Sequence, residues 1–248
     1  MTEHVANRLQ VISSSQADYD AQRCVSRESP CPYLPGQYWR SEAYLVDRMD
    51  GSVYERLMER GFRRSGHIVY RPRCRTCREC QPFRVRVDDF VPTRSMRRVL
   101  RQNADISVEA DPPTPTEEKF EVYLRYLLDR HDGPRDREFD AFRTFLYESS
   151  TETIEFTYRL DGRVIGASLA DRVPRGLSSV YMYFDPDFGE RSLGTFSVLW
   201  EIEFCRRAAW PFYYLGYYVA GSSKMAYKAR FQPGELLASG GTWAPFPG

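Results

Sequence analysis

The order of strands and helices expected between residues 153 and 228 constrains the fold of this chain more than any other feature. Three strands come first, and Asp161-Gly162 between the first two is typical of a two-residue hairpin turn. A long, largely apolar helix, a fourth strand and a short helix with two lysines follow. The expected ranges are 153–160, 163–173 and 178–184 for the three strands, 192–209 for the long helix and 212–219 for the last strand. This order predicts an α/β (α+β) fold.

The order also resembles the C-terminal part of the GNAT-type acyltransferase fold. The turn Arg191-Ser192-Leu193-Gly194 leads into the long helix, at the place where that fold binds the phosphates of its donor. The resemblance therefore implies that Arg191 and Ser192 contact the donor. One glycine is a weak motif by itself, so the element order carries most of this comparison.

The first half of the chain reads as shorter elements around a proline-rich boundary, Asp111-Pro-Pro-Thr-Pro115. Ser52 is expected to cap a helix that Gly61 ends, and Thr114 a helix that runs to about His131. The other expected elements are strands at 67–71 and 83–90, a basic helix at 93–103 and a short helix at 139–146. We expect a basic, cysteine-containing N-terminal subdomain at 1–110 and a GNAT-like transferase domain at 111–248.

The formal net charge of +1 hides a strongly basic segment. Residues 60–101 contain thirteen arginines, no lysine and three acids, a net charge of +10 against about −9 for the remainder. Such a block predicts a polyanionic partner, and nucleic acid is the simplest one. The alternative is a protein whose basic half docks on its own acidic half. The candidate contacts to nucleic acid are Arg94, Arg97 and Arg98.

Lysine is rare, because only Lys119, Lys224 and Lys228 occur among the 35 basic residues. Lys224 and Lys228 stand four residues apart, which places both on one face of a helix. Ser222 or Ser223 suits the N-cap, so free backbone N–H groups are expected near Lys224. These features predict a phosphate site, although a solvated helix face explains the spacing equally well. Lys119 is expected on a solvated helix face.

Three cysteines lie within seven residues, in Cys74-Arg-Thr-Cys77-Arg-Glu-Cys80. Cys31 is a candidate for a fourth metal ligand, and Cys24 is another. Four thiolates suit tetrahedral zinc or an iron–sulfur cluster, and nearby arginines would lower the pKa of the thiols. The alternative is a tight loop with metal-free cysteines.

The sequence favours a cytoplasmic protein without a membrane segment. No apolar run approaches the ~20 residues that span a bilayer, and residues 1–20 have no signal-peptide core. The cysteines are therefore expected as reduced thiols or metal ligands rather than disulfides. Cys205 lies inside the long apolar helix and is expected in the core.

Several longer motifs resemble the aminoacyl-tRNA–protein transferase family over about residues 24–235. They are Cys31-Pro-Tyr-Leu-Pro-Gly36, Gly61-Phe-Arg-Arg-Ser-Gly66, Tyr70-Arg-Pro72, the cysteine loop, Ser192-Leu-Gly-Thr-Phe-Ser-Val-Leu-Trp-Glu-Ile-Glu-Phe204, Tyr213-Tyr-Leu-Gly-Tyr-Tyr218 and Lys224-Met-Ala-Tyr-Lys-Ala-Arg-Phe-Gln-Pro233. Within the family, the chain is similar to the short bacterial aspartate/glutamate leucyltransferases. The eukaryotic arginyltransferases carry a second cysteine where this chain has Leu34, so their metal site does not transfer directly.

The resemblance implies transfer of leucine from leucyl-tRNA to the α-amine of an N-terminal Asp or Glu, which marks the acceptor protein for N-end-rule degradation. This aminolysis of an activated ester needs a neutral amine and support for the developing oxyanion, and no cofactor. Arginine is the alternative amino acid. A CoA-dependent GNAT acyltransferase and a nonenzymatic, zinc-bearing RNA-binding protein are the rival functions.

The residue inventory allows this chemistry. Asp185 is a candidate to position or deprotonate the amine, although Asp185-Pro186 also suits a plain turn. Three tyrosines are candidates to donate hydrogen bonds or to stack on the terminal adenine, with core packing as the alternative. The tyrosines are Tyr183, Tyr214 and Tyr217, and the two lysines expected near the 3′-end phosphates are Lys224 and Lys228.

Overall fold

The computed structural model describes residues 9–11, 22–130 and 137–247, and the chain forms two compact units. Unit 1 comprises 1–86, 149–151 and 214–248, and unit 2 comprises 87–148 and 152–213. This division differs from the expected 1–110 and 111–248. The reason is that strands late in the sequence pair with the strand that ends at Arg86, so both ends of the chain belong to unit 1.

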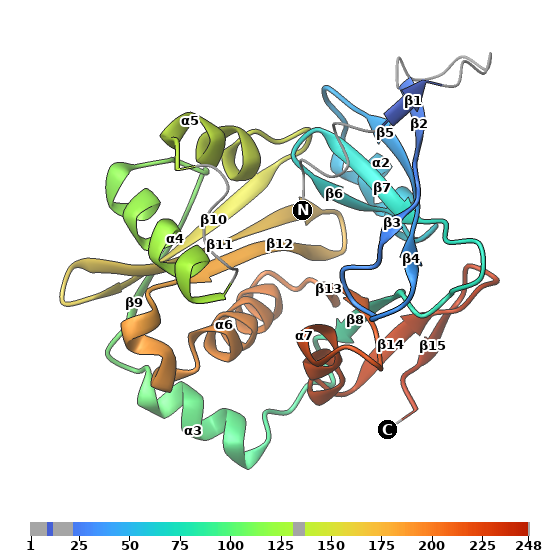
Figure 1. The fold of residues 1–248 in the computed structure, drawn as a ribbon. Helices are drawn as coiled ribbons and strands as arrows, with labels where there is room; N and C mark the ends of the chain where they lie inside the picture. Colours follow the sequence, from blue (N-terminus) through green and yellow to red (C-terminus); the bar gives the residue numbers. More distant parts are fainter. Residues whose placement is uncertain (1–8, 12–21, 131–136, 248) are drawn as a thin grey trace. The chain divides into compact units, whose positions relative to one another are not determined.

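Unit 1 contains an antiparallel sheet with the strand order β1-β2-β5-β7-β6 (Figure 1). Its strands are β1 (Leu9–Val11), β2 (Gln22–Ser26), β5 (Ser41–Leu45), β6 (Arg63–Ser65) and β7 (Ile68–Pro72). A two-stranded sheet pairs β3 (Ser29–Pro30) with β4 (Tyr38–Trp39). Of these strands, the sequence predicted only β7.

The rest of unit 1 joins the two ends of the chain. Strand β8 (Gln81–Arg86) pairs with β14 (Gly234–Leu237), which pairs with β15 (Trp243–Pro245). Helix α2 (Gly51–Met58), helix α7 (Ser223–Ala226) and the 3₁₀ turn η3 (Tyr227–Arg230) complete the unit. Strand β13 (Phe212–Tyr218) brings the chain from unit 2 into unit 1.

Unit 2 is built on the expected meander, with one additional strand. Strands β10 (Thr153–Leu160), β11 (Arg163–Val173) and β12 (Gly176–Phe184) pair in sequence order, and β9 (Ser107–Asp111) adds to β10. Asp161 and Gly162 have φ of 49° and 82°, so the expected hairpin turn is present. Strand β9 was not predicted, because it ends at Asp111, where the proline-rich boundary begins.

Helices cover both faces of this meander (Figure 1). Helix α4 (Glu117–Arg130) packs on β11 and β12, and α6 (Leu193–Arg207) packs on β12. Successive residues of β10 point to opposite faces, so Phe156 meets Trp200 of α6 while Glu155 points toward α4. Unit 2 therefore has the expected α+β order of three strands, a long helix and a strand.

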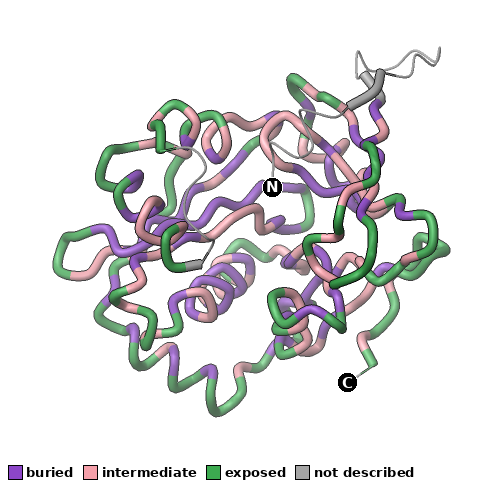
Figure 2. Tube along the Cα trace, in the orientation of Figure 1, coloured by how far each residue is buried: buried purple, intermediate pink, exposed green. Residues whose placement is uncertain are grey.

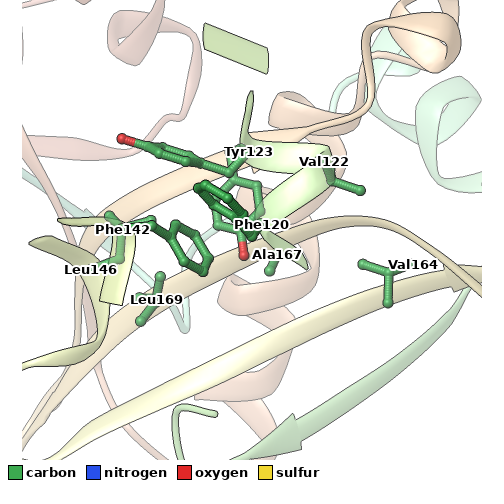
Figure 3. Packing of buried hydrophobic residues seen from close by; sticks show 9 residues of the cluster. Phe120, Val122, Tyr123, Phe142, Leu146, Val164, Ala167 and Leu169 are labelled. Atoms are coloured by element: carbon green, nitrogen blue, oxygen red, sulfur yellow. The ribbon is translucent and has the colours of Figure 1, made fainter. Parts of the chain in front are cut away.

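The core between α4 and the meander is aromatic (Figure 3). Tyr123 packs edge-on against Tyr183, with ring centroids 5.5 Å apart. The ring centroids of Tyr123 and Phe142 are 5.0 Å apart. Phe142 ends α5 (Phe139–Phe142), which continues into the π-helical turn η1 (Arg143–Tyr147). The cluster consists of Phe120, Val122, Tyr123, Phe142, Leu146, Val164, Ala167, Leu169 and Tyr183.

Two helix starts differ from the sequence prediction. Asp50, rather than Ser52, caps α2 and accepts a hydrogen bond of 2.7 Å from the Ser52 amide. Thr116 accepts from the Lys119 amide at the start of α4, whereas the amide of Thr114 donates to a side chain of β10. Sequence spacing alone could not choose between neighbouring cap residues.

The basic segment 60–101 is divided between the two units after Arg86. Within unit 1, Arg84 is buried against Glu235 at 2.6 Å, and Arg71 and Arg73 bind Glu42. These ion pairs agree with the alternative interpretation, in which the basic segment pairs with acidic residues elsewhere in the chain. By contrast, helix α3 (Arg94–Gln102) in unit 2 exposes its arginines (Figure 2).

Some expectations concern segments outside the described residues. These segments are most of the polar N-terminal stretch 1–20, the helix end at His131 and the loop at Gly133-Pro134. In the part of the chain that the structure describes, no helix is both long and apolar enough to cross a membrane.

Candidate active site

The predicted site residues fall into two groups, one in each unit. Each group is described by itself. Unit 2 holds Tyr183, Asp185, Arg191, Ser192 and the α3 arginines Arg94, Arg97 and Arg98. Unit 1 holds Tyr214, Tyr217, Lys224, Lys228 and the cysteines Cys31, Cys74, Cys77 and Cys80.

Asp185 follows β12 and is completely buried. Arg163 donates to its Oδ2 at 2.6 Å, and Arg125 lies 2.9 Å from its Oδ1. Oδ1 also accepts from the Asp187 amide at 3.1 Å, which caps the turn that begins at Pro186. The carboxylate therefore anchors two partly exposed arginines. This geometry gives Asp185 an anchoring role within unit 2, and its expected role of positioning or deprotonating the amine stays a prediction.

Tyr183 belongs to a chain of hydrogen bonds that runs through the core. Its hydroxyl lies 2.8 Å from that of Tyr147, which donates to Glu155 Oε1 at 2.7 Å. Lys119 lies 2.6 Å from Glu155 Oε2 and also donates to the Thr114 carbonyl at 2.9 Å. Burial, as the main cause, raises the pKa of Tyr183, so it stays a neutral phenol.

The expectation that Lys119 lies on a solvated helix face is wrong, because only 6% of it is exposed. Its ammonium forms a buried ion pair with Glu155, 36 residues later in the sequence. Sequence reasoning also missed Glu155 and Tyr147 as members of this network. The available signal was the alternation along β10, where Thr153, Glu155 and Thr157 share one face.

Arg191 and Ser192 form the junction before α6. Arg191 makes a two-pronged ion pair with Asp105, at 2.8 and 3.0 Å, and also donates to the Gln102 carbonyl. Ser192 has a left-handed backbone, with φ of 57°, and no side-chain cap bond. A Cβ placed on Gly194 would meet nothing within 4 Å, so the first turn of α6 is open. Arg191 thus attaches the junction before α6 to the end of α3, and its guanidinium is paired with Asp105.

Lys228 in unit 1 is buried, with 5% of its surface exposed. Its Nζ donates to the Tyr217 carbonyl at 2.6 Å and lies 3.8 Å from the sulfur of Met225. Burial, followed by the charge of Arg63, lowers the pKa of Lys228 to about 7. Lys224 is exposed. The two lysines do not share an accessible face, because the helix tightens into a 3₁₀ turn after Ala226.

Two buried basic side chains hold the backbone on both sides of Gly216 in β13. Gly216 has φ of 88°, a conformation that favours glycine. Arg63 donates to the Tyr214 carbonyl at 3.5 Å before it, and Lys228 donates to the Tyr217 carbonyl after it. A Cβ on Gly216 would lie 3.4 Å from Lys228 Nζ. Lys228 therefore fixes a bend in the strand.

Tyr214 and Tyr217 are both core residues. The hydroxyl of Tyr214 donates to Glu55 at 3.2 Å, and that of Tyr217 donates to the Gly61 carbonyl at 2.8 Å. The two residues are 1% and 3% exposed, which leaves no ring face for a nucleotide base. For these two tyrosines, the structure supports the core-packing alternative.

The cysteines of the loop lie within electrostatic range of one another. Burial, followed by the neighbouring thiols of Cys31, Cys74 and Cys77, raises the pKa of Cys80 to about 12. In the described residues, however, no three His, Cys, Asp or Glu side chains are arranged to hold a metal ion. A structural zinc or iron–sulfur site at these cysteines stays a prediction, which metal analysis of anaerobically purified protein checks. Cys205 is buried in α6, as expected.

Two family models match this chain. Residues 29–98 match the family model described as Arginine-tRNA-protein transferase, N terminus, and residues 118–238 match the model described as Arginine-tRNA-protein transferase, C terminus. Among solved structures, FemX aligns with a TM-score of 0.42 and 10% identity, covering 66% of this chain and 59% of that chain.

Two curated relatives are both named aspartate/glutamate leucyltransferase. The protein from Paramagnetospirillum magneticum is 42% identical, over 88% of this chain and 90% of the relative. The one from Methylobacterium nodulans is 44% identical, over 84% of this chain and 90% of the relative. The chain belongs to the arginine-tRNA-protein transferase family, which is the aminoacyl-tRNA–protein transferase family that its motifs predicted.

Proposed function

We propose that this protein transfers leucine from leucyl-tRNA to the N-terminal Asp or Glu of acceptor proteins. The observation that carries the proposal is the identity of 42–44% to aspartate/glutamate leucyltransferases over nearly the whole chain. Leucine at the new N-terminus would mark the acceptor for N-end-rule degradation. Charged tRNA and newly exposed N-termini both occur in the cytoplasm, so we place the reaction there.

The reaction forms a bond between the acceptor nitrogen and the leucyl carbonyl carbon, and breaks the ester bond to the tRNA ribose. The amine proton passes to the leaving oxygen, directly or through water. The ester is already activated, so the protein need not supply a nucleophile. Lys228 and Glu201, whose pKa values burial shifts to about 7, are both buried. We therefore propose that neither acts as the base and that the protein works mainly by positioning both substrates and excluding water.

The decisive assay compares donors and acceptors in one format. Leucyl-tRNA, arginyl-tRNA and acetyl-CoA, each with a labelled acyl group, are incubated with peptides that differ only at the first residue. Asp and Glu peptides should accept leucine. The isosteric Asn and Gln peptides, and an N-acetylated Asp peptide, should not.

Two results would replace this proposal. Preferential transfer of arginine would establish the second candidate, which the description of the matching family models favours. Transfer of acetyl groups from CoA, without transfer from either tRNA, would establish a CoA-dependent acyltransferase.

A further inference from the structure

Unit 2 carries an open depression beside α3. Its volume is about 660 Å³, and its lining residues are Arg98, Arg101, Gln102 and Glu190. Arg98 and Arg101 are three residues apart, so they lie on the same face of α3. Buried Met96 and Val99 secure the opposite face of the helix.

The two arginines of the depression differ from most others in unit 2. Arg125, Arg159, Arg163 and Arg191 each pair with a carboxylate. Arg98 and Arg101 are exposed, and neither guanidinium makes a hydrogen bond or ion pair with the described residues. Their donors are therefore available to a ligand.

The walls of the depression are fixed before any ligand arrives. Gln102 donates to the Glu190 carbonyl at 3.3 Å, and Asn103 donates to the Arg191 carbonyl at 2.9 Å. Arg191 returns a hydrogen bond of 3.1 Å to the Gln102 carbonyl while it holds Asp105. The end of α3 is thus attached to the junction before α6 by reciprocal bonds. A preformed site loses less free energy on binding than a flexible one.

We propose that this depression binds a backbone phosphodiester of the donor tRNA, an inference that rests on the proposed function. Two guanidinium groups and the Glu190 carboxylate leave a net charge of +1, which one phosphodiester neutralises. The planar guanidinium fork matches phosphate oxygens in pairs. The first turn of α6 begins at Leu193, just beyond Glu190, and its partial positive charge favours an anion nearby.

The arrangement along α3 favours a polyanion over a single carboxylate. Arg94, Arg98 and Arg101 follow one stripe of the helix, and Arg94 to Arg101 span about 10 Å at 1.5 Å per residue. A nucleic-acid strand advances roughly 3.4 Å per nucleotide along its helix axis, so the stripe can follow about three phosphates. An acceptor peptide need present only the side-chain carboxylate of its first residue, which would leave most of this stripe of arginines unused.

The test measures binding of uncharged leucine-specific tRNA by the full-length protein at several salt concentrations. The variant is Arg98→Ala/Arg101→Ala, and the matched control is Arg172→Ala/Arg207→Ala. The control also removes two charges, from exposed arginines that pair with Glu152 and Glu203. Arg207 lies at the far end of α6, roughly 20 Å along the helix from Leu193. Circular dichroism and melting temperature establish that each variant is folded.

We expect the α3 variant to flatten the slope of log affinity against log salt by about one to two, and the control to change it much less. Affinity at low salt should fall at least about tenfold, the effect of losing charge-assisted hydrogen bonds. Arg98→Lys/Arg101→Lys should restore the slope more fully than the affinity, because lysine keeps the charge and loses the fork.

An unchanged slope, or equal loss in the control variant, overturns the inference. A raised KM for the Asp peptide with unchanged tRNA binding also overturns it, in favour of an acceptor site. Failure of the proposed function is a separate result: the wild-type protein would then bind tRNA without transferring leucine. Transfer assays on the wild type and tRNA binding by the variants thus distinguish the two.

Discussion

Replacing Lys228 by methionine should change how the stability of the protein depends on pH. In the folded protein the pKa of Lys228 is about 7, against an ordinary 10.5. Between these values the unfolded chain holds a proton that the folded chain has released, so folding stability increases with pH. The penalty for burying this amine is complete below about pH 7 and is relieved as pH rises toward 10.5.

The size of the effect follows from the difference between the folded and unfolded pKa values of Lys228. A tenfold change in an acid dissociation constant corresponds to about 1.4 kcal/mol, so the wild type should gain about 2 kcal/mol from this group between about pH 7 and about pH 9. For a chain of this size, that corresponds to an increase of roughly 4–8 °C in melting temperature. Lys228→Met has no amine to titrate and should lack this gain. It leaves the Tyr217 carbonyl without its donor, but that cost is independent of pH.

The assay is thermal unfolding of the wild type and Lys228→Met at closely spaced pH values, with Lys224→Met as the matched control. Lys224 is exposed, so its removal should leave the wild-type curve in place. The quantity to compare is the difference between wild type and variant at each pH, which cancels other titrating groups. Parallel curves for the wild type and Lys228→Met would show that Lys228 is charged and solvated in the folded protein, and the reasoning would fail.

Three further changes test other parts of the structure. Burial raises the pKa of Glu201 to about 7, so the wild type should lose about 3 kcal/mol of folding stability as pH rises from about 4.5 to 7. Glu201→Gln should not show this loss when both proteins are unfolded by urea over that pH range. Lys119→Ala leaves Glu155 buried without its ion-pair partner and should destabilise the protein by roughly 3–5 kcal/mol, with Lys119→Ala/Glu155→Gln recovering part of the loss; an effect below about 1 kcal/mol would indicate a solvated pair. Gly216→Ala should cost about 1–2 kcal/mol because of its positive φ, and a Gly216→Ala protein as stable as the wild type would mean that β13 relaxes its bend.

The parts of the fold that the sequence predicted best are those set by neighbouring residues. Asp161-Gly162 required a tight hairpin, and Thr93 predicted the start of α3, where its hydroxyl accepts from the Met96 amide. The apolar pattern of 192–209 predicted α6 within two residues at its C-terminal end. Local backbone preference and hydrophobic period determine such features, so a single sequence suffices for them.

The roles of charged residues were harder to predict, because their partners lie far away in the sequence. Lys119 and Glu155 are 36 residues apart, and Arg84 and Glu235 are 151 apart. The same limitation applies to Asp185, whose two arginine partners come from α4 and from the start of β11. Sequence reasoning found the correct positions for several site residues, but it could not tell a buried anchor from an accessible functional group.

The pairing of β8 with β14 has a consequence for the order in which the protein folds during synthesis. All of unit 2 has been made once the ribosome has added Tyr213, whereas one edge of β8 lacks its partner until Gly234–Leu237 emerges. Domains fold as units as the chain appears, so the internal unit can fold before the one that begins the chain. Until then β8 presents unpaired backbone groups, so the nascent protein is prone to aggregate in the interval before β14 becomes available.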